Sequence, residues 1–240
     1  MDDKEGFAAS NPTANINADK LIKKLKDSLH QSPGTLGHGQ LHTKAGWIRS
    51  ANGDMYDSGG AQQSRALLFA ALHASGPDKD NPGLLSSAHD ASLQTLDPTV
   101  WKDFSTIEHV RPQNPENKQS WESESPDNDI KLHSLGNLTI LPSGTNSALG
   151  NKDWDFKRTC FKIMATPDLA ARKRLQEDFE ATSGHTIPPK YVEGEYMPFG
   201  KSLGKVDKWT VELMQQRELN ILERAWDRLA PWMGIDETPT

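Results

Sequence analysis

Hydrophobic and polar positions along the 240-residue chain follow two periods, one typical of helices and one typical of short strands. The helical pattern predicts an amphipathic helix over 18–31, a buried helix over 61–76 and a further helix over 168–182. A longer helix is predicted over 208–229, where one face turns to the core through Leu219, Leu222, Trp226 and Leu229. Helices therefore dominate the expected fold.

Two short apolar runs predict strands, "TIEHV" at 106–110 and "LGNLTILP" at 135–142, the second ended by a proline. The acidic segment 114–129 between them is expected to be a long loop, and 77–92 is expected to be a loop as well. Residues 144–164 pass from turn residues into a helix. The order strand, long loop, strand, turn and helix predicts an α+β, mostly helical fold.

Composition narrows the class of protein. The net charge is −6, so any contact with nucleic acid has to come from a local basic patch. The single cysteine, Cys160, excludes a disulfide framework and a multi-cysteine zinc site, and its apolar surroundings predict a core position. No apolar run approaches the roughly 20 residues that span a bilayer, and the acidic N-terminus lacks a signal-peptide core. We expect a cytoplasmic protein with no membrane partner.

Three polar clusters accompany the strand-strand-helix unit: Glu108-His109, Asn137, and Asn146 with Asn151. Phosphodiester hydrolysis needs a base that deprotonates water and a cation that carries charge on the leaving oxygen. His109 is the candidate base, and Asn137 is the candidate group that orients it, through its amide oxygen or its backbone carbonyl. Glu108 and Asn146 offer oxygen ligands that suit Mg²⁺ or Mn²⁺.

The segments "IEHVRPQ" and "LGNLTILPSGTNSALGNKDWDFK" resemble the HNH, or His-Me finger, endonucleases. The resemblance is closest to the C-terminal nuclease domain of the GmrSD-type modification-dependent restriction enzymes. It implies a ββα-metal finger core surrounded by helices, and metal-dependent hydrolysis of DNA by nicking or double-strand cleavage. It makes His109 the general base, Glu108 and Asn146 the metal ligands, and Asn137 the residue that orients the base.

Further positions also match the family. The resemblance suggests Lys157 as a catalytic residue that neutralises a phosphate, and Asn151 as a secondary site residue or a helix cap. A solvated helix lysine and a turn asparagine stay open as alternatives for these two positions. The final helix of the family carries a W…R…L…W pattern, which fits Trp209, Arg217, Leu222 and Trp226.

Two features depart from the family pattern. His109 and Asn137 are 28 positions apart, which indicates that the acidic segment 114–129 is an insertion. Position 146 holds asparagine rather than histidine, and a neutral amide oxygen binds a cation more weakly than a carboxylate does.

A local basic patch is predicted on the finger helix and its successor. Residues 152–174 hold seven basic and three acidic side chains, a net charge of +4 in a chain that is negative overall. Such a patch binds phosphates in a salt-sensitive, largely sequence-independent way, although a solvated helix face stays open for 172–174. The predicted nucleic-acid contacts are Arg111, Lys152, Lys157, Arg158, Lys162, Arg172, Lys173 and Arg174.

We expect residues 1–35 to form a flexible arm with a short amphipathic helix, and 36–240 to form the nuclease domain. Within that domain the finger core is expected at 105–163 and a helical part at 167–230. The resemblance also implies a prokaryotic restriction or antiviral defence system, with an NTP-dependent, DUF262-like DNA-sensing module on the same or another chain.

Other readings stay open. One is a non-catalytic DNA- or partner-binding module that retains the finger, and another is a ribonuclease toxin. The segment "HGQLH" at 38–42 has two histidines at helical spacing but lacks the glutamate of the H-E-x-x-H zinc motif. His133 is near enough in the chain to approach the site, and a structural role is expected for it.

Overall fold

The computed structural model describes residues 43–51, 56, 60–88, 95–96, 103–117, 121, 132–142, 145 and 149–233. The helix predicted over 18–31, the "HGQLH" segment and Asn146 lie outside the described residues. The described helices are α2 (Lys44–Ala51), α3 (Ala61–Leu72), the 3-10 turn η5 (Leu135–Asn137), α6 (Trp154–Met164), α7 (Leu169–Ser183), α8 (Pro189–Val192), α9 (Gly200–Gly204) and α10 (Val211–Met233). The described strands are β1 (Ser75–Pro77), β2 (Leu85–Ser87), β3 (Thr106–His109) and β4 (Leu138–Leu141).

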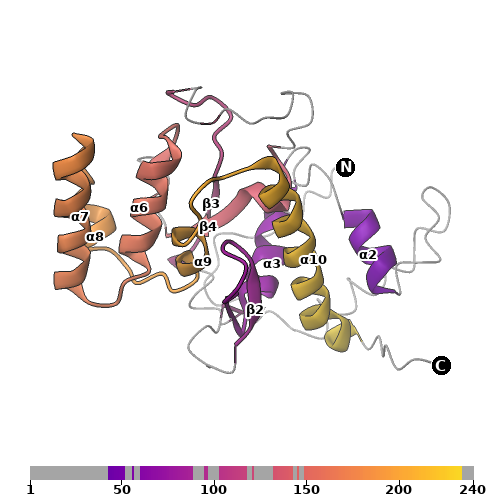
Figure 1. Cartoon of the computed structure of the whole chain (residues 1–240). Coiled ribbons are helices and arrows are strands. Elements are labelled where there is room, and N and C mark those ends of the chain that lie inside the picture. Colours follow the sequence, from indigo (N-terminus) through magenta and orange to yellow (C-terminus); the bar gives the residue numbers. More distant parts are fainter. Residues whose placement is uncertain are drawn as a thin grey trace, which may run out of the picture.

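The two predicted strands pair with each other at the centre of the molecule. β3 and β4 are antiparallel, with Thr106 opposite Leu141 and His109 opposite Leu138. η5 leads directly into β4, and its backbone extends the ladder because the Val110 amide donates to the Asn137 carbonyl at 2.8 Å. In Figure 1 this pair lies between α6 on one side and α10 on the other. The predicted order of strand, strand and helix is present.

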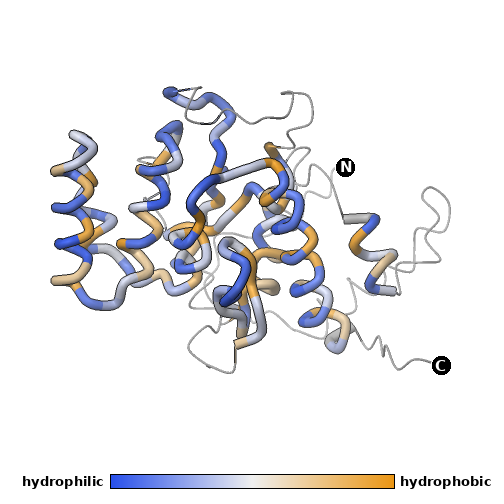
Figure 2. The backbone as a smooth tube through the Cα atoms, in the orientation of Figure 1, coloured by the Kyte–Doolittle hydropathy of each residue, from blue (hydrophilic) through white to orange (hydrophobic). Residues whose placement is uncertain are grey.

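One core of buried side chains joins α3, the strand pair, α6 and α10, and α10 packs along α3. Figure 2 shows hydrophobic and hydrophilic positions alternating along α10. Leu222 and Trp226 are buried as the helical pattern predicts, but Leu219 is 44% exposed, so its prediction is wrong. The core face of α10 is rotated towards Met214 and Ile221, which are buried.

α6 and α7 form a layer beside the strand pair (Figure 1). α6 begins after Asp153, whose carboxylate accepts a hydrogen bond from the Phe156 amide at 2.9 Å. α7 begins after Asp168, which caps the Ala171 amide at 2.7 Å, and ends at Gly184 with a left-handed φ of 70°. The helix predicted over 168–182 is therefore confirmed.

Two elements differ from the sequence prediction. The helix predicted to reach residue 76 ends at Leu72, and the chain then pairs as β1 with β2, of which β2 lies within the region expected to be a loop. Three-residue strands carry too few positions for an alternating pattern to reveal them. A further helix, α2, lies in the glycine-rich region, where the Trp47 ring packs 5.6 Å from the Trp226 ring. Within the part of the chain that the structure describes, every helix is too short or too polar to cross a lipid bilayer.

Candidate active site

The turn before β4 lies directly against the backbone of α10. A Cβ added at Gly136 would lie 1.8 Å from the Met214 carbonyl oxygen, so only glycine permits this approach. The Arg217 guanidinium donates to the carbonyls of Gly136 at 2.7 Å and Leu138 at 2.8 Å. Burial lowers the pKa of Arg217 to about 10. The glycine of the "LGN" motif and the arginine of the final helix thus fix the start of β4.

Asn137 is fully buried and joins three segments of chain. Its amide oxygen accepts hydrogen bonds from the Arg111 backbone amide at 2.8 Å and from the Trp209 indole at 3.2 Å. Its amide nitrogen donates to the carbonyls of Arg111 and Leu132, each at 2.9 Å. These partners are backbone groups and an indole rather than the His109 imidazole. Asn137 therefore holds the segment that follows His109, which corrects the expectation of a direct contact with the ring.

β3 presents its last two side chains to different surroundings, as strand alternation requires. Glu108 is 4% exposed and lies against α6, where its carboxylate pairs with the Lys157 ammonium at 2.5 Å. Lys157 is itself fully buried, and its ammonium also donates to the His109 backbone carbonyl at 2.8 Å. One lysine of α6 thus holds both the side chain of Glu108 and the backbone at His109.

Burial opposes charge on both members of this pair. It raises the pKa of Glu108 to about 7, and the attraction of Lys157 works against that rise. It lowers the pKa of Lys157, and the attraction of Glu108 works against that fall. Each charge is therefore retained in the interior only through the other.

This pairing corrects two predictions. The Glu108 carboxylate forms an ion pair with the buried Lys157 ammonium, so in this structure it is not exposed as a metal ligand. Lys157 is neither a solvated helix lysine nor placed to neutralise a phosphate at the surface, because it is fully buried. Both residues are better described as the support beneath His109.

The His109 imidazole lies in a small cluster of aromatic rings. Its Nε2 is 3.2 Å from Nδ1 of His133, and the two rings are nearly perpendicular at 86°. The Tyr56 ring packs edge-on against His109 at 4.8 Å and is parallel to the His133 ring, 5.9 Å away, with 8° between the planes. His109 and His133 are both partly exposed. The cluster holds a titratable ring at a fixed orientation and in reach of solvent, as a general base requires.

The other predicted site residues are placed apart from this cluster or are not described. Asn151 is exposed, and its backbone carbonyl accepts from the Glu116 amide at 2.8 Å, a turn-like role. The proposed ligand Asn146 lies outside the described residues. Among the residues that are described, no group of three His, Cys, Asp or Glu side chains is arranged to hold a metal ion.

The place of His133 in the chain allowed it to approach the site, but neither its contact with His109 nor the contribution of Tyr56 was predicted. His133 was expected to be structural, and Tyr56 lies outside both motif segments. Neither position belongs to a periodic pattern. The only signal for His133 in the sequence is its place between the two motif segments "HVRPQ" and "LGN".

The predicted basic residues do not form one exposed patch. Arg172 is 5% exposed, and its guanidinium donates to the carbonyls of Val192 at 3.0 Å and Gly194 at 2.7 Å. It therefore serves the fold, and its assignment to nucleic acid is corrected because its donors are used internally. Lys157 is excluded on the same ground, since it is buried in its ion pair.

The remaining basic residues are partly or fully accessible. Lys152 pairs with Glu116 at 2.8 Å and Arg158 pairs with Asp207 at 2.9 Å, so both carry an acidic neighbour. Arg111 and Lys162 are partly exposed, and Lys173 and Arg174 are exposed on α7.

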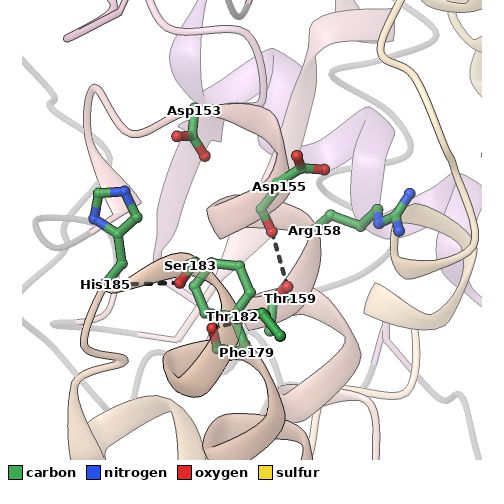
Figure 3. Close-up of a pocket in the computed structure, with 8 residues that line it drawn as sticks. All are labelled: Asp153, Asp155, Arg158, Thr159, Phe179, Thr182, Ser183 and His185. Carbon is green, nitrogen blue, oxygen red and sulfur yellow. Dashed lines mark hydrogen bonds between the residues drawn. The ribbon is translucent and has the colours of Figure 1, made fainter.

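A hollow of about 510 Å³ lies between the start of α6 and the end of α7. Figure 3 shows its lining residues, which are Asp153, Asp155, Arg158, Thr159, Phe179, Thr182, Ser183 and His185. Asp153 is the cap of α6 and Arg158 is paired with Asp207, so two of its charged groups already have structural partners. None of the residues predicted to be catalytic lines this hollow.

Comparison with known families gives a match that covers most of the chain. The model of the family described as GmrSD restriction endonucleases, C-terminal domain, matches residues 53–224. No curated protein matches the chain. The match includes β3, η5, β4 and α6, and with them every described residue of the His109 cluster. The chain therefore belongs to the family of C-terminal domains of GmrSD restriction endonucleases.

Proposed function

We propose that this chain is a metal-dependent HNH endonuclease that hydrolyses DNA phosphodiester bonds, with β3, β4 and α6 as its ββα finger. Membership of a restriction endonuclease family supports a nuclease function. Two observations support the finger. The antiparallel strands β3 and β4 are followed by the helix α6, and Lys157 of α6 donates a hydrogen bond to the His109 carbonyl at the end of β3.

The observation that carries the proposal is the position of His109. Its backbone is held by the buried Lys157 ammonium, and the segment after it is held by Asn137. Its imidazole is partly exposed on the other side of β3, against His133 and Tyr56. A supported backbone with an accessible, oriented imidazole is the arrangement that general-base catalysis needs.

In the proposed reaction the His109 imidazole takes a proton from a water molecule. The resulting hydroxide attacks phosphorus, the bond from phosphorus to the leaving 3′ oxygen breaks, and that oxygen departs with the electron pair. Such a base contributes about 10²–10⁴ to the rate.

Metal dependence is proposed from the resemblance of the motif, with Mg²⁺ or Mn²⁺ as the cation and Asn146 as an oxygen ligand. The described residues do not complete a metal site, since Glu108 is paired with Lys157. The metal requirement therefore needs its own measurement.

We further propose a role in prokaryotic restriction or antiviral defence, together with an NTP-dependent, DUF262-like sensing module. For DNA contacts we propose the accessible basic residues, which are Arg111, Lys152, Arg158, Lys162, Lys173 and Arg174.

The test is incubation of the full chain with supercoiled plasmid and, separately, with single-stranded RNA. Each reaction is run with Mg²⁺, with Mn²⁺ and with excess EDTA. We expect nicked or linear plasmid with either cation and none with EDTA. A salt-sensitive gel shift without cleavage would favour a binding module, and cleavage of RNA alone would favour a ribonuclease; either result would overturn the proposal.

A further inference from the structure

We propose that His133 is a positioning residue for His109: it accepts a hydrogen bond from Nε2 of His109 and thereby fixes the tautomer and plane of that ring. This inference rests on the proposed function, in which His109 is the general base. His133 is 24 positions away along the chain, beyond the acidic segment, and reaches the site from the start of the second strand.

At this distance one of the two rings must donate a proton and the other must accept it. Nε2 of His109 and Nδ1 of His133 are 3.2 Å apart, and a hydrogen bond between two imidazoles needs one donor and one acceptor. The amide nitrogen of Gln113, which can only donate, also faces Nδ1 of His133 at 3.5 Å. Nδ1 of His133 has a single lone pair, and with a donor amide facing it this nitrogen is the acceptor side of the contact, which places the His109 proton on Nε2.

This assignment determines which nitrogen of His109 is the base. A neutral imidazole carries one proton, so a proton on Nε2 leaves the basic lone pair on Nδ1. Loss of the acceptor beside Nε2 removes the interaction that favours a proton at that nitrogen, and only this tautomer presents a base at Nδ1. His133 therefore acts on the reaction through both the tautomer and the plane of the His109 ring.

Tyr56 and the chain around His133 hold the acceptor in place. The Tyr56 ring is parallel to His133 at 5.9 Å and edge-on to His109 at 4.8 Å, so both ring planes have a packing partner. The Tyr56 amide donates to the His133 backbone carbonyl at 3.3 Å. The preceding carbonyl, of Leu132, accepts from Asn137 at 2.9 Å. His133 is thus presented by the same turn that fixes the end of β3.

Two substitutions of similar size separate the hydrogen bond from simple packing. Asparagine places its amide oxygen two bonds from Cβ, as histidine places Nδ1, so His133→Asn retains the acceptor. His133→Leu has a comparable volume and no acceptor. His185, exposed at the edge of the hollow in Figure 3, provides the matched control as His185→Leu.

The experiment measures kcat and KM for nicking of supercoiled plasmid by the full chain with Mg²⁺ or Mn²⁺. We expect His133→Leu to lower kcat by about 10-fold to 100-fold, the size of effect known for partners that orient metal-binding histidines. We expect KM to be unchanged, and kcat to be largely retained in His133→Asn and fully retained in His185→Leu. Wild-type kcat in His133→Leu would overturn the inference, as would an equal loss in the asparagine and leucine variants.

Nitrogen NMR of the histidine rings gives a second readout that does not need activity. In the wild type, the His109 shifts should report a proton on Nε2, and in His133→Leu they should report a mixture of tautomers. The same tautomer population in both proteins would overturn the inference. If His133→Leu fails to fold, His133→Gln replaces it, because its longer side chain moves the acceptor away from the Nδ1 position. A wild-type chain that shows the predicted tautomer but nicks no plasmid would refute the proposed function and leave the contact intact.

Discussion

Replacing Lys157 with methionine removes the ammonium and keeps most of the aliphatic stem, so it isolates the charge beneath His109. In the wild type that ammonium lies 2.5 Å from the Glu108 carboxylate and 2.8 Å from the His109 carbonyl. Both side chains of the pair are almost fully buried, at 0% and 5% exposure. Methionine leaves the carboxylate in the core without a cation, and removing one member of a buried pair costs roughly 3–5 kcal/mol of unfolding free energy.

The pH dependence of this loss has a definite sign. Burial raises the pKa of Glu108 from about 4.5 to about 7, against the pull of Lys157. A carboxyl with a raised pKa contributes stability that is fully present below the unfolded value and is lost as pH rises through the folded value. Wild-type stability from this group should therefore fall from about pH 4.5 to pH 7 and then level off. Without Lys157 the folded pKa rises further, so the fall continues above pH 7 at about 1.4 kcal/mol per pH unit.

The assay is urea unfolding from pH 5 to pH 9, followed by tryptophan fluorescence. The double variant Glu108→Gln/Lys157→Met removes both charges and should be more stable than Lys157→Met at pH 8. Lys173→Met, at an exposed lysine of α7, should stay within about 0.5 kcal/mol of wild type. The reasoning is refuted if Lys157→Met matches wild type at pH 8, or if the double variant is no more stable than the single one.

Other substitutions test the buried contacts that hold the fold around the site and the proposed DNA surface on α7. Gly136→Ala places a Cβ 1.8 Å from the Met214 carbonyl, so thermal melting should show a loss above about 3 kcal/mol, and a loss below 1 kcal/mol would contradict that contact. Arg172→Gln should lower the melting temperature, because its guanidinium serves buried carbonyls. Lys173→Gln/Arg174→Gln should leave melting unchanged and reduce the slope of log affinity for plasmid against log salt by about 0.9 per lost phosphate contact. An unchanged slope would remove α7 from the proposed DNA surface.

Local patterns in the sequence were sufficient for the elements that carry the motif. The apolar runs around Glu108 and after Asn137 identified both strands, and the helical patterns over 144–164 and 168–182 identified α6 and α7. These features depend on residues within a few positions of one another, which is the range over which periodicity and capping act.

Partners from distant segments could not be read in the same way. Glu108 and Lys157 are 49 positions apart, and each alone has the appearance of a surface charge. Arg172 and Lys173 are neighbours with the same charge, but the rotation of α7 buries one and exposes the other. Leu219 is similarly exposed on α10, whose buried face includes Met214 and Ile221. Such outcomes depend on how helices pack, which the local pattern does not specify.

The contacts of His133 illustrate the same limit within the site. The sequence places it just before the second strand, but its approach to His109 depends on the antiparallel register and on Tyr56. The sequence identified Asn137 as a candidate site residue. In the structure its amide oxygen accepts from the backbone of Arg111 rather than contacting the imidazole.

The central claim is that His109 is the general base of a DNA endonuclease, and the nicking rate of His109→Ala tests it most directly. The measurement compares wild type, His109→Ala and His185→Ala on supercoiled plasmid with Mg²⁺ or Mn²⁺, after melting curves confirm that all three are folded. We predict a rate for His109→Ala at least about 10²-fold below wild type, the lower end of the contribution of a general base, and a wild-type rate for His185→Ala. Nicking by His109→Ala at the wild-type rate would contradict the account.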